Sequence, residues 1–285
     1  MRRIIESAVV VLVLVACDSD FTKGWLVDRT RVLGLRIEAA ADPTRATVSP
    51  GEKLVARWLV GAPNGTPSLA WSFALCDSPT GNFPEPRCER DPLVVGSGAS
   101  NRQSVTTMEV DVPASVDRDA GAILLAAFCE GGPVASFDPR SFNATCAGGT
   151  APLLASGSVS MVAPNKNPTL AADVVTLDGA PLTPTDLPLG EACSVAPRVD
   201  ASSKHEIGFR FQDREPGESM IVSHVATKGE LDRQYSSVDL GEPLPKVVTV
   251  PWTAAALDDA EIYFALRDGR GGAALARYVI CLRRP

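Results

Sequence analysis

The sequence predicts an all-β protein. The chain of 285 residues contains 23 glycines and 23 prolines, which divide its apolar segments into short lengths. Several of these segments alternate apolar and polar residues, the period at which the side chains of a β-strand share one face. Leu54, Ala56, Trp58 and Val60 follow this pattern, and no long amphipathic helix is visible in the sequence.

In the first half of the chain, short apolar segments lie between turn-forming residues and predict a series of strands. In one of them Leu69, Trp71, Phe73 and Leu75 share a face, so we expect Trp71, like Trp58, to lie in a core. The strands are expected at residues 32–37, 53–60, 69–76, 105–112, 123–129 and 156–162.

The polar segment 165–168, Asn-Lys-Asn-Pro, marks a boundary, after which the strand signals return. The pair Asp268-Gly269 separates the last two apolar segments and predicts a hairpin turn. Trp252 follows Pro251 near the end of a strand, and the sequence leaves its burial open. The strands of this half are expected at residues 173–177, 205–211, 220–226, 246–250, 261–266 and 274–282, with a helical turn near 255–259.

The N-terminal residues read as an export signal. Arg2 and Arg3 precede the apolar run 8–16, which is far shorter than the ~20 residues of a membrane-spanning helix. The tetrad Leu14-Val15-Ala16-Cys17 resembles the lipobox of bacterial lipoproteins. This resemblance implies a signal peptide at 1–16, a fatty anchor on Cys17 and a place on a bacterial membrane, facing the periplasm or the exterior. A plain secretory signal and an uncleaved anchor are the alternatives.

The segment 17–30 is expected to be a tether. Asp18 resembles an inner-membrane retention signal of some lipoproteins, but the sequence leaves the choice between inner and outer membrane open. Trp25 would either rest at the membrane interface or pack on the domain that follows.

Two further segments carry a resemblance to known folds. The run Thr47-Val48-Ser49-Pro50-Gly51-Glu52, followed by a strand and then by the Trp71 strand, resembles the start of an immunoglobulin-like or PKD-like sandwich. The run 262–272 is similar to the last hairpin of such modules. The resemblance implies two immunoglobulin-like β-sandwiches in tandem, at 31–164 and 165–285, and the fold alone implies no activity.

The cysteine count supports export. Setting Cys17 aside leaves an even number of cysteines, as expected for disulfides outside the cytoplasm, although six cysteines allow 15 pairings. We favour neighbours along the chain, because each of the first two pairs would bracket a loop rich in glycine and proline. A zinc site is disfavoured because no Cys-x-x-Cys occurs. The favoured pairs are Cys76–Cys88, Cys129–Cys146 and Cys193–Cys281.

Charge and motifs argue against several function classes. The formal net charge is −7 with no basic cluster, which disfavours nucleic acid as a partner. His205 and His224 are the only histidines. Neither accompanies a Gly-x-Ser-x-Gly elbow, and His205-Glu206 does not continue into a metalloprotease motif. We therefore expect no catalytic residue and no enzyme.

No cofactor is expected, with weakly bound calcium as the remaining possibility. Calcium prefers oxygen-rich loops, although no Asp-x-Asp-x-Asp-Gly arrangement occurs here. The loop carboxylates that would serve are Asp117, Asp119, Asp138, Asp258, Asp259 and Glu261.

The functional expectation is a lipid-anchored envelope protein with a binding or structural role. Its partner would be an unidentified envelope or extracellular protein, or a glycan. The loops 77–87 and 130–145, each bridged by cysteines, are the expected recognition surface. The alternatives are a subunit of an envelope enzyme complex and a spacer stiffened by calcium.

Overall fold

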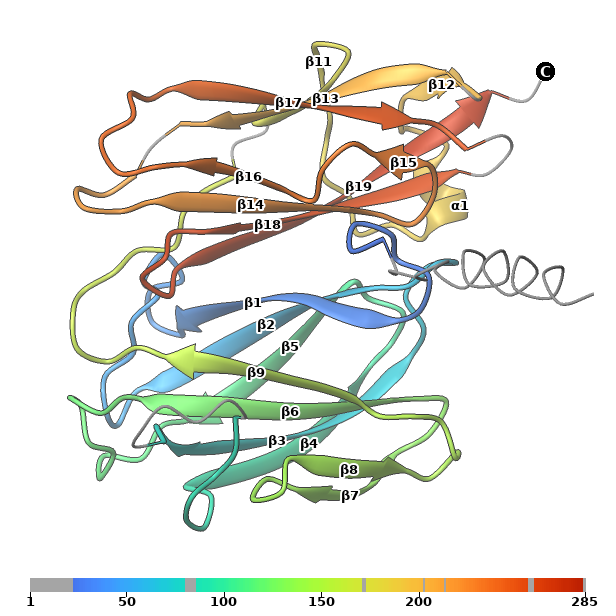
Figure 1. Ribbon diagram of the computed structural model, residues 1–285. Helices are drawn as coiled ribbons and strands as arrows, with labels where there is room; N and C mark the ends of the chain where they lie inside the picture. The colour runs from blue at the N-terminus through green and yellow to red at the C-terminus, as the bar shows by residue number, and fades with distance from the viewer. Residues whose placement is uncertain are drawn as a thin grey trace, which may run out of the picture.

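A computed structural model describes residues 23–79, 86–170, 173–201, 203–212, 214–255 and 259–283, and it is almost entirely β (Figure 1). The predicted all-β class is confirmed. The one helix in this part of the chain is α1 (Leu189–Ala192), so the described residues contain no helix long enough to cross a membrane. Cys17 and the rest of the export signal lie outside the described residues.

The N-terminal half is built from two antiparallel sheets that face each other. One has the strand order β1-β2-β5 and the other β4-β3-β6-β9, and a hairpin, β7-β8, lies beside the second (Figure 1). The strands are β1 (Arg31–Ala39), β2 (Lys53–Gly61), β3 (Leu69–Asp77), β4 (Val94–Ser100), β5 (Val105–Asp111), β6 (Ala122–Glu130), β7 (Val134–Asp138), β8 (Asn143–Cys146) and β9 (Leu153–Val159).

The alternation of inward-facing and outward-facing residues along the strands explains the core of this half. The inward side chains of β2 and β6 meet between the sheets, where Trp58 contacts Phe128 edge to face at 5.9 Å. The outer face of β6 is buried as well, because Phe137 and Phe142 of the β7-β8 region cover Leu125. A strand buried on both faces needs apolar residues at every position, which is why β6 reads Ala-Ile-Leu-Leu-Ala-Ala-Phe-Cys.

The C-terminal half repeats the arrangement of two facing sheets. Their strand orders are β11-β10-β13-β17-β15 and β12-β19-β18-β14-β16, and β12 joins β19 in parallel. The strands are β10 (Val175–Leu177), β11 (Ala180–Pro181), β12 (Arg198–Asp200), β13 (Lys204–Phe211), β14 (Met220–Ala226), β15 (Glu230–Leu231), β16 (Tyr235–Val238), β17 (Lys246–Thr253), β18 (Ala260–Arg267) and β19 (Ala273–Arg283).

Aromatic side chains fill the core of the C-terminal half. Phe209 on β13 stacks on Phe264 of β18 at 5.7 Å, and Tyr278 of β19 meets Phe264 edge to face. Trp252, whose burial the sequence left open, is fully buried in this core and donates its indole N–H to the Lys228 carbonyl at 3.1 Å. Each half thus has its own core. The division into two immunoglobulin-like domains at 31–164 and 165–285 stays a prediction.

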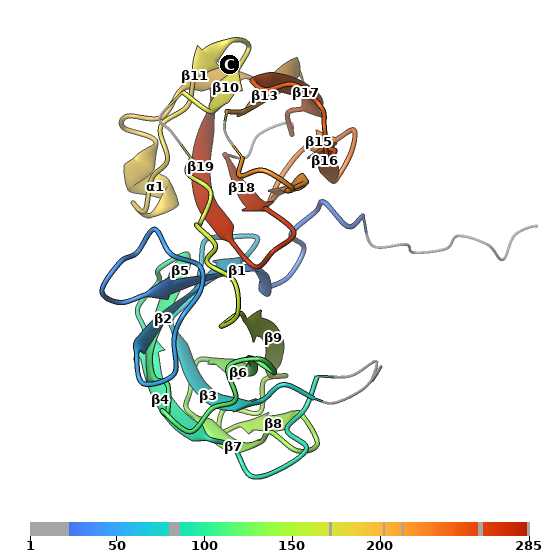
Figure 2. The same ribbon diagram turned by 90° about the vertical axis from the view of Figure 1, so that its left-hand side faces the viewer.

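The two halves meet through β1 on one side and the β18-β19 hairpin on the other (Figure 2). Leu59 of the N-terminal half packs with Val225 and Tyr263 of the C-terminal half. Gly34 permits this approach, because a Cβ there would lie 2.8 Å from a methyl carbon of Leu275. The halves are therefore joined by a packed interface as well as by the chain.

The segment 165–168, expected as a boundary, lies within this interface and bonds to both halves. The buried Asn167 side chain donates to the Ile37 carbonyl at 2.7 Å and accepts from the Ala273 amide at 3.0 Å. Asn165, also buried, donates to Asp268 at 2.9 Å. A polar boundary in the sequence is a buried hydrogen-bonded connection in the fold.

Two expectations for loops are wrong in part. Residues 23–30, assigned to a tether, pack on the C-terminal half: Val27 is fully buried, Leu26 bridges to Ala226, and Trp25 lies against the C-terminal core rather than on the N-terminal half. The segment 130–145, expected as a loop, contains the β7-β8 hairpin. Part of the helical turn expected at 255–259 lies outside the described residues.

Candidate functional site

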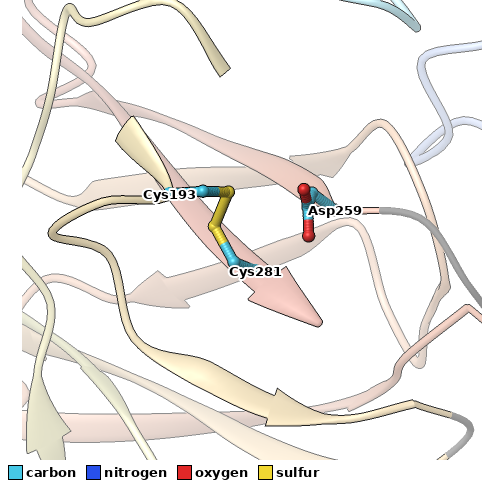
Figure 3. A group of neighbouring side chains, drawn as sticks. All are labelled: Cys193, Asp259 and Cys281. Atoms are coloured by element: carbon cyan, nitrogen blue, oxygen red, sulfur yellow. A yellow bond between two sulfur atoms is a disulfide. The ribbon is translucent and has the colours of Figure 1, made fainter. Parts of the chain in front are cut away.

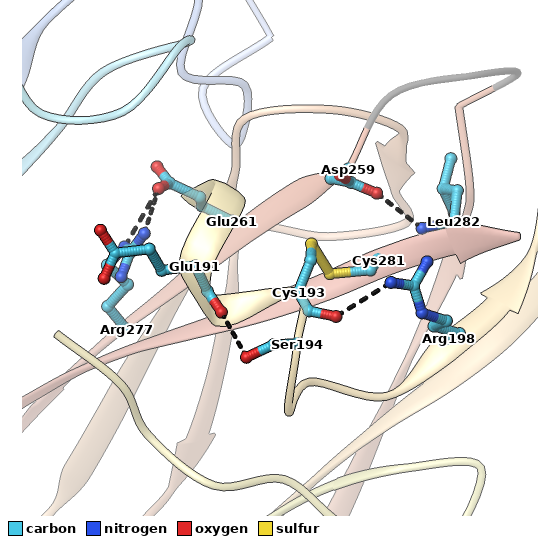
Figure 4. Close-up of a disulfide and its surroundings, with 9 residues drawn as sticks. All are labelled: Glu191, Cys193, Ser194, Arg198, Asp259, Glu261, Arg277, Cys281 and Leu282. Carbon is cyan, nitrogen blue, oxygen red and sulfur yellow. Dashed lines mark hydrogen bonds and ion pairs between the residues drawn. A yellow bond between two sulfur atoms is a disulfide. The ribbon is translucent and has the colours of Figure 1, made fainter. Parts of the chain in front are cut away.

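The structure joins the cysteines in the three pairs that the sequence favoured, Cys76–Cys88, Cys129–Cys146 and Cys193–Cys281. The first two fasten the connections that follow β3 and β6. The third ties α1 to β19 (Figure 4). Three disulfides indicate a protein that folds outside the reducing cytoplasm.

One group of side chains has the spacing of a metal site. Within the described ranges, only Cys193, Asp259 and Cys281 bring three possible ligand atoms within 4.8 Å of one another (Figure 3). A cysteine binds a metal ion through its thiolate, and these two sulfurs are bonded to each other. Asp259 is occupied too, since it accepts the backbone N–H of Leu282 at 2.8 Å (Figure 4). The intact disulfide therefore does not fit a metal centre.

The structure does not gather the carboxylates considered for calcium. Asp117 and Asp138 each accept a backbone N–H two residues ahead, so they close local turns. Hydrogen bonds from the Ser141 hydroxyl and the Arg140 amide lower the pKa of Asp138. Asp119 is exposed in the Asp117 turn, and Asp258 lies outside the described residues. Calcium binding stays a prediction.

Glu261, expected in a loop, lies on β18 and is 1% exposed. Its carboxylate binds the buried Arg277 guanidinium and accepts the Tyr263 hydroxyl at 2.5 Å. Burial and this carboxylate raise the pKa of Tyr263. Arg277 also donates to the carbonyls of Thr185 and Leu187. These charges satisfy one another, so the cluster is structural.

His224 is a core residue of β14. Its Nε2 lies 2.9 Å from the Ser236 hydroxyl, and its ring meets Phe264 edge to face. Its Nδ1 has no hydrogen-bond partner among the residues that the structure describes. Burial lowers its pKa to about 4. The histidine is therefore neutral near pH 7 and enclosed, which does not suit acid-base chemistry on a ligand.

His205 lies in an arrangement that the sequence did not reveal. Its Nε2 is 2.6 Å from the Ser203 hydroxyl and its Nδ1 is 2.8 Å from Asp178. The order matches a Ser-His-Asp triad. However, the Ser203 hydroxyl also bonds the Asp200 carbonyl, and Asp178 accepts the Glu206 amide at 2.8 Å. None of these residues lines a cavity described below, and the arrangement ties the β10-β11 turn to β13.

One hollow is a groove of about 720 Å³ between β1 and β9, here called the β1–β9 groove. Residues 29–35 line one side and residues 151–158 the other, with Ile37 and Trp58 below. Arg267 and Gly271 of the β18-β19 hairpin close one end, so both halves contribute. Figure 2 shows β1 and β9 on the side of the N-terminal half that faces this hairpin. The volume is typical of ligand sites.

The groove is basic although the chain is acidic. Arg29, Arg31 and Arg267 line it, while no Asp or Glu does. In the part of the chain that the structure describes, none of these arginines forms an ion pair. Burial is the main cause that lowers the pKa of Arg31; Asp28 opposes it, and the neighbouring Arg29 adds to it. The lining thus carries three cations and no carboxylate, and Asp28 is the acidic neighbour that acts on Arg31.

Two residues that line the groove each have an enclosed donor without an acceptor. The Arg31 Nε and the Trp58 Nε1 are enclosed and make no hydrogen bond within the described residues. Trp58 is 1% exposed. A buried donor without a partner costs about 1–3 kcal/mol, so each of these two donors lowers the stability of the fold.

The comparisons with known proteins leave the family open. No family model matches the sequence, and no curated protein matches it. A solved structure with which the chain aligns is described as "Crystal structure of Salmonella alpha-2-macroglobulin reacted with methylamine". The identity is 12%, the alignment covers 89% of this chain and 16% of that chain, and the TM-score is 0.26. At that score the similarity carries no argument about function.

The loops that the sequence predicted as the recognition surface do not line the groove. Residues 80–85 of the loop 77–87 lie outside the described residues, and the segment 130–145 folds over the far side of β6. The groove escaped sequence reasoning because its residues come from four separate parts of the chain, 29–37, Trp58, 151–158 and 267–271. Arg29 and Arg31 were the one local signal, two cations beside a strand start.

Proposed function

We propose that this protein is a non-enzymatic binding protein of the bacterial cell envelope, anchored on a membrane by lipidated Cys17. The lipobox-like tetrad supports the anchor, and the disulfides agree with a location outside the cytoplasm. A fatty anchor would hold the chain on the membrane because each buried methylene contributes about 0.8 kcal/mol and more than one acyl chain gives stable attachment.

The β1–β9 groove carries the proposal of a binding role. It is formed by both halves, which are fastened together by the buried side chains of Asn165 and Asn167. A rigid groove loses little conformational entropy when a partner docks. Its three lining arginines, with no carboxylate among the lining residues, favour ligand binding over a purely structural role for this surface.

The anchor is tested by replacing the modified residue. Cys17→Ala should leave the protein unattached to membranes, because the thiol that accepts the lipid is absent. Membrane fractions of cells that make the wild type or the variant are compared by immunoblot. Full membrane retention of the variant would contradict lipid anchoring. Intact-mass analysis of the wild type should show cleavage before Cys17 and an added acyl mass.

The binding role is tested in intact cells. A photo-crosslinking residue at Ser156, exposed on β9, should capture a partner, whereas the same residue at Thr107, exposed on β5 of the other sheet, should not. Equal capture from both positions, or none from Ser156, would contradict a binding role for the groove. Labelling of Ser203 by a fluorophosphonate would instead favour an enzyme.

A further inference from the structure

We infer that the β1–β9 groove binds an extended, acidic peptide segment of a partner protein, which pairs with the free edge of β9. The inference rests on the proposed binding role and names the chemistry of the ligand. Its basis is the combination of an open strand edge and three arginines in one hollow that no acidic residue lines.

The lining of the groove shows that it follows the edge of β9. Every residue from 151 to 158 lines it. Successive side chains of a strand point to opposite faces, so a hollow that touches all of them runs along the main chain. β9 pairs with β6 on one side, and no described strand pairs with it on the other. Its outer amide and carbonyl groups are therefore available for a ladder.

Nothing in the sequence of β9 protects this edge. Exposed edges usually carry a charged residue, a proline or a bulge that prevents pairing with another chain. β9 reads Leu-Leu-Ala-Ser-Gly-Ser-Val, so it contains neither a charged residue nor a proline. Its register with β6 is unbroken, so it contains no bulge. The facing edge of β1 differs, because Arg267 bonds the Leu33 carbonyl and Asn167 bonds the Ile37 carbonyl. An added strand would therefore pair with β9.

The groove side chains specify acidic residues. Arg29 and Arg31 lie at the start of β1 and Arg267 lies across from them on the C-terminal half, with no carboxylate among the lining residues. A peptide carboxylate beside them would make charge-assisted hydrogen bonds.

The floor of the groove specifies apolar residues between the acidic ones. Leu35 and Trp58 come from the first sheet, and Leu153 comes from β9. Leu35 lies directly on Gly157, where a Cβ would be 2.1 Å from its methyl carbon. A strand that lies in this groove presents alternate side chains to the arginines and to this apolar floor. The expected ligand alternates acidic and apolar residues.

Selection from phage-displayed random linear peptides tests this inference on the full chain in detergent. The selected peptides should be enriched in Asp and Glu at alternate positions. Their affinity is then measured by fluorescence anisotropy. Arg29→Glu should weaken binding at least about tenfold, the effect of losing one charge-assisted contact. Arg29 is suited to this test because it is exposed and makes no hydrogen bond within the described residues.

The matched control is Arg90→Glu, an exposed arginine outside the groove, which changes the net charge equally and should leave the affinity within about twofold. Two versions of a selected peptide are N-methylated at every second residue, one at the odd positions and one at the even positions. Loss of binding by either version would support a main-chain ladder, whereas full binding by both versions would overturn the inference.

Three further outcomes would also overturn the inference: no enrichment of acidic peptides, an equal effect of the two arginine variants, or binding of polygalacturonate in preference to every selected peptide. The last outcome would assign the groove to an acidic glycan. If these tests fail while crosslinking at Ser156 still captures a partner, the proposed binding role stands and only the peptide is excluded.

Discussion

His224 shows what a single buried ionisable side chain implies for stability. The native pKa is about 4 because the ring is enclosed, and the ordinary value is 6.5. Between these values the unfolded chain binds a proton that the native protein does not. The free energy of unfolding therefore falls as the pH decreases through this window, by about 3 kcal/mol in total.

Urea unfolding measures this dependence. At about pH 5.5 the stability of the wild type should be about 1.4 kcal/mol lower than near neutrality through His224 alone. His224→Phe keeps an aromatic ring beside Phe264 and should remove this part of the decrease. His205→Asn serves as the control and should retain it. A His224→Phe protein with the wild-type pH dependence would refute the assignment.

Residue types predicted burial well where packing alone decided it. Trp58 alternates with Leu54 and Ala56 and is buried as expected, whereas Trp71, on an equally regular strand, is half-buried. Glu261 could not be placed from its own neighbourhood, because the cation that neutralises it, Arg277, lies sixteen residues away. A charged side chain is buried only where an opposite charge or hydrogen-bond donor accompanies it. A local sequence pattern does not identify which residue that is.

At the scale of elements, the disulfides divide into a short and a long constraint. Cys129 and Cys146 are 17 residues apart, and Cys193 and Cys281 are 88 apart. A disulfide stabilises mainly by restricting the unfolded chain, and the effect grows with the length of the closed loop. The long bridge should therefore contribute more.

Two double variants test this ranking, since each replaces two cysteines by alanine. Cys129→Ala with Cys146→Ala should lower the free energy of unfolding by about 3 kcal/mol, and Cys193→Ala with Cys281→Ala by about 4.6 kcal/mol. Urea unfolding without reductant gives both values. A larger loss from the short bridge would show that the packing of the β7-β8 hairpin on β6, rather than loop entropy, dominates.

The strands that the sequence predicted best are those with a strong apolar pattern. The expected segment 220–226 coincides with β14, and 53–60 falls within β2 (Lys53–Gly61). Strand β4 was missed because its Val-Val-Gly-Ser-Gly-Ala-Ser sequence is rich in small residues, and β7 and β8 because the sequence around them resembles a loop. Edge strands and covering hairpins gain their order from neighbours, which local composition does not encode.

For the whole molecule, the decisive feature is that the two halves form a packed interface. The sequence marked 165–168 as a boundary from its polarity, but polarity equally suits a buried connection whose side chains satisfy main-chain groups. The β1–β9 groove depends on this interface, because Arg267 reaches it from the C-terminal half. Loss of the interface should therefore affect binding as well as stability.

Asn167 provides the test. Asn167→Ala leaves the Ile37 carbonyl and the Ala273 amide without their partner, at a cost of about 1–3 kcal/mol for each buried group. Thermal unfolding should shift to lower temperature, and hydrogen exchange at the Ala273 amide should become faster. Asn101→Ala, at an exposed site, is the control and should change stability by less than about 0.5 kcal/mol. Unchanged exchange at Ala273 would mean that the interface is held by its apolar contacts at Leu59, and the groove would then keep its shape without the asparagine.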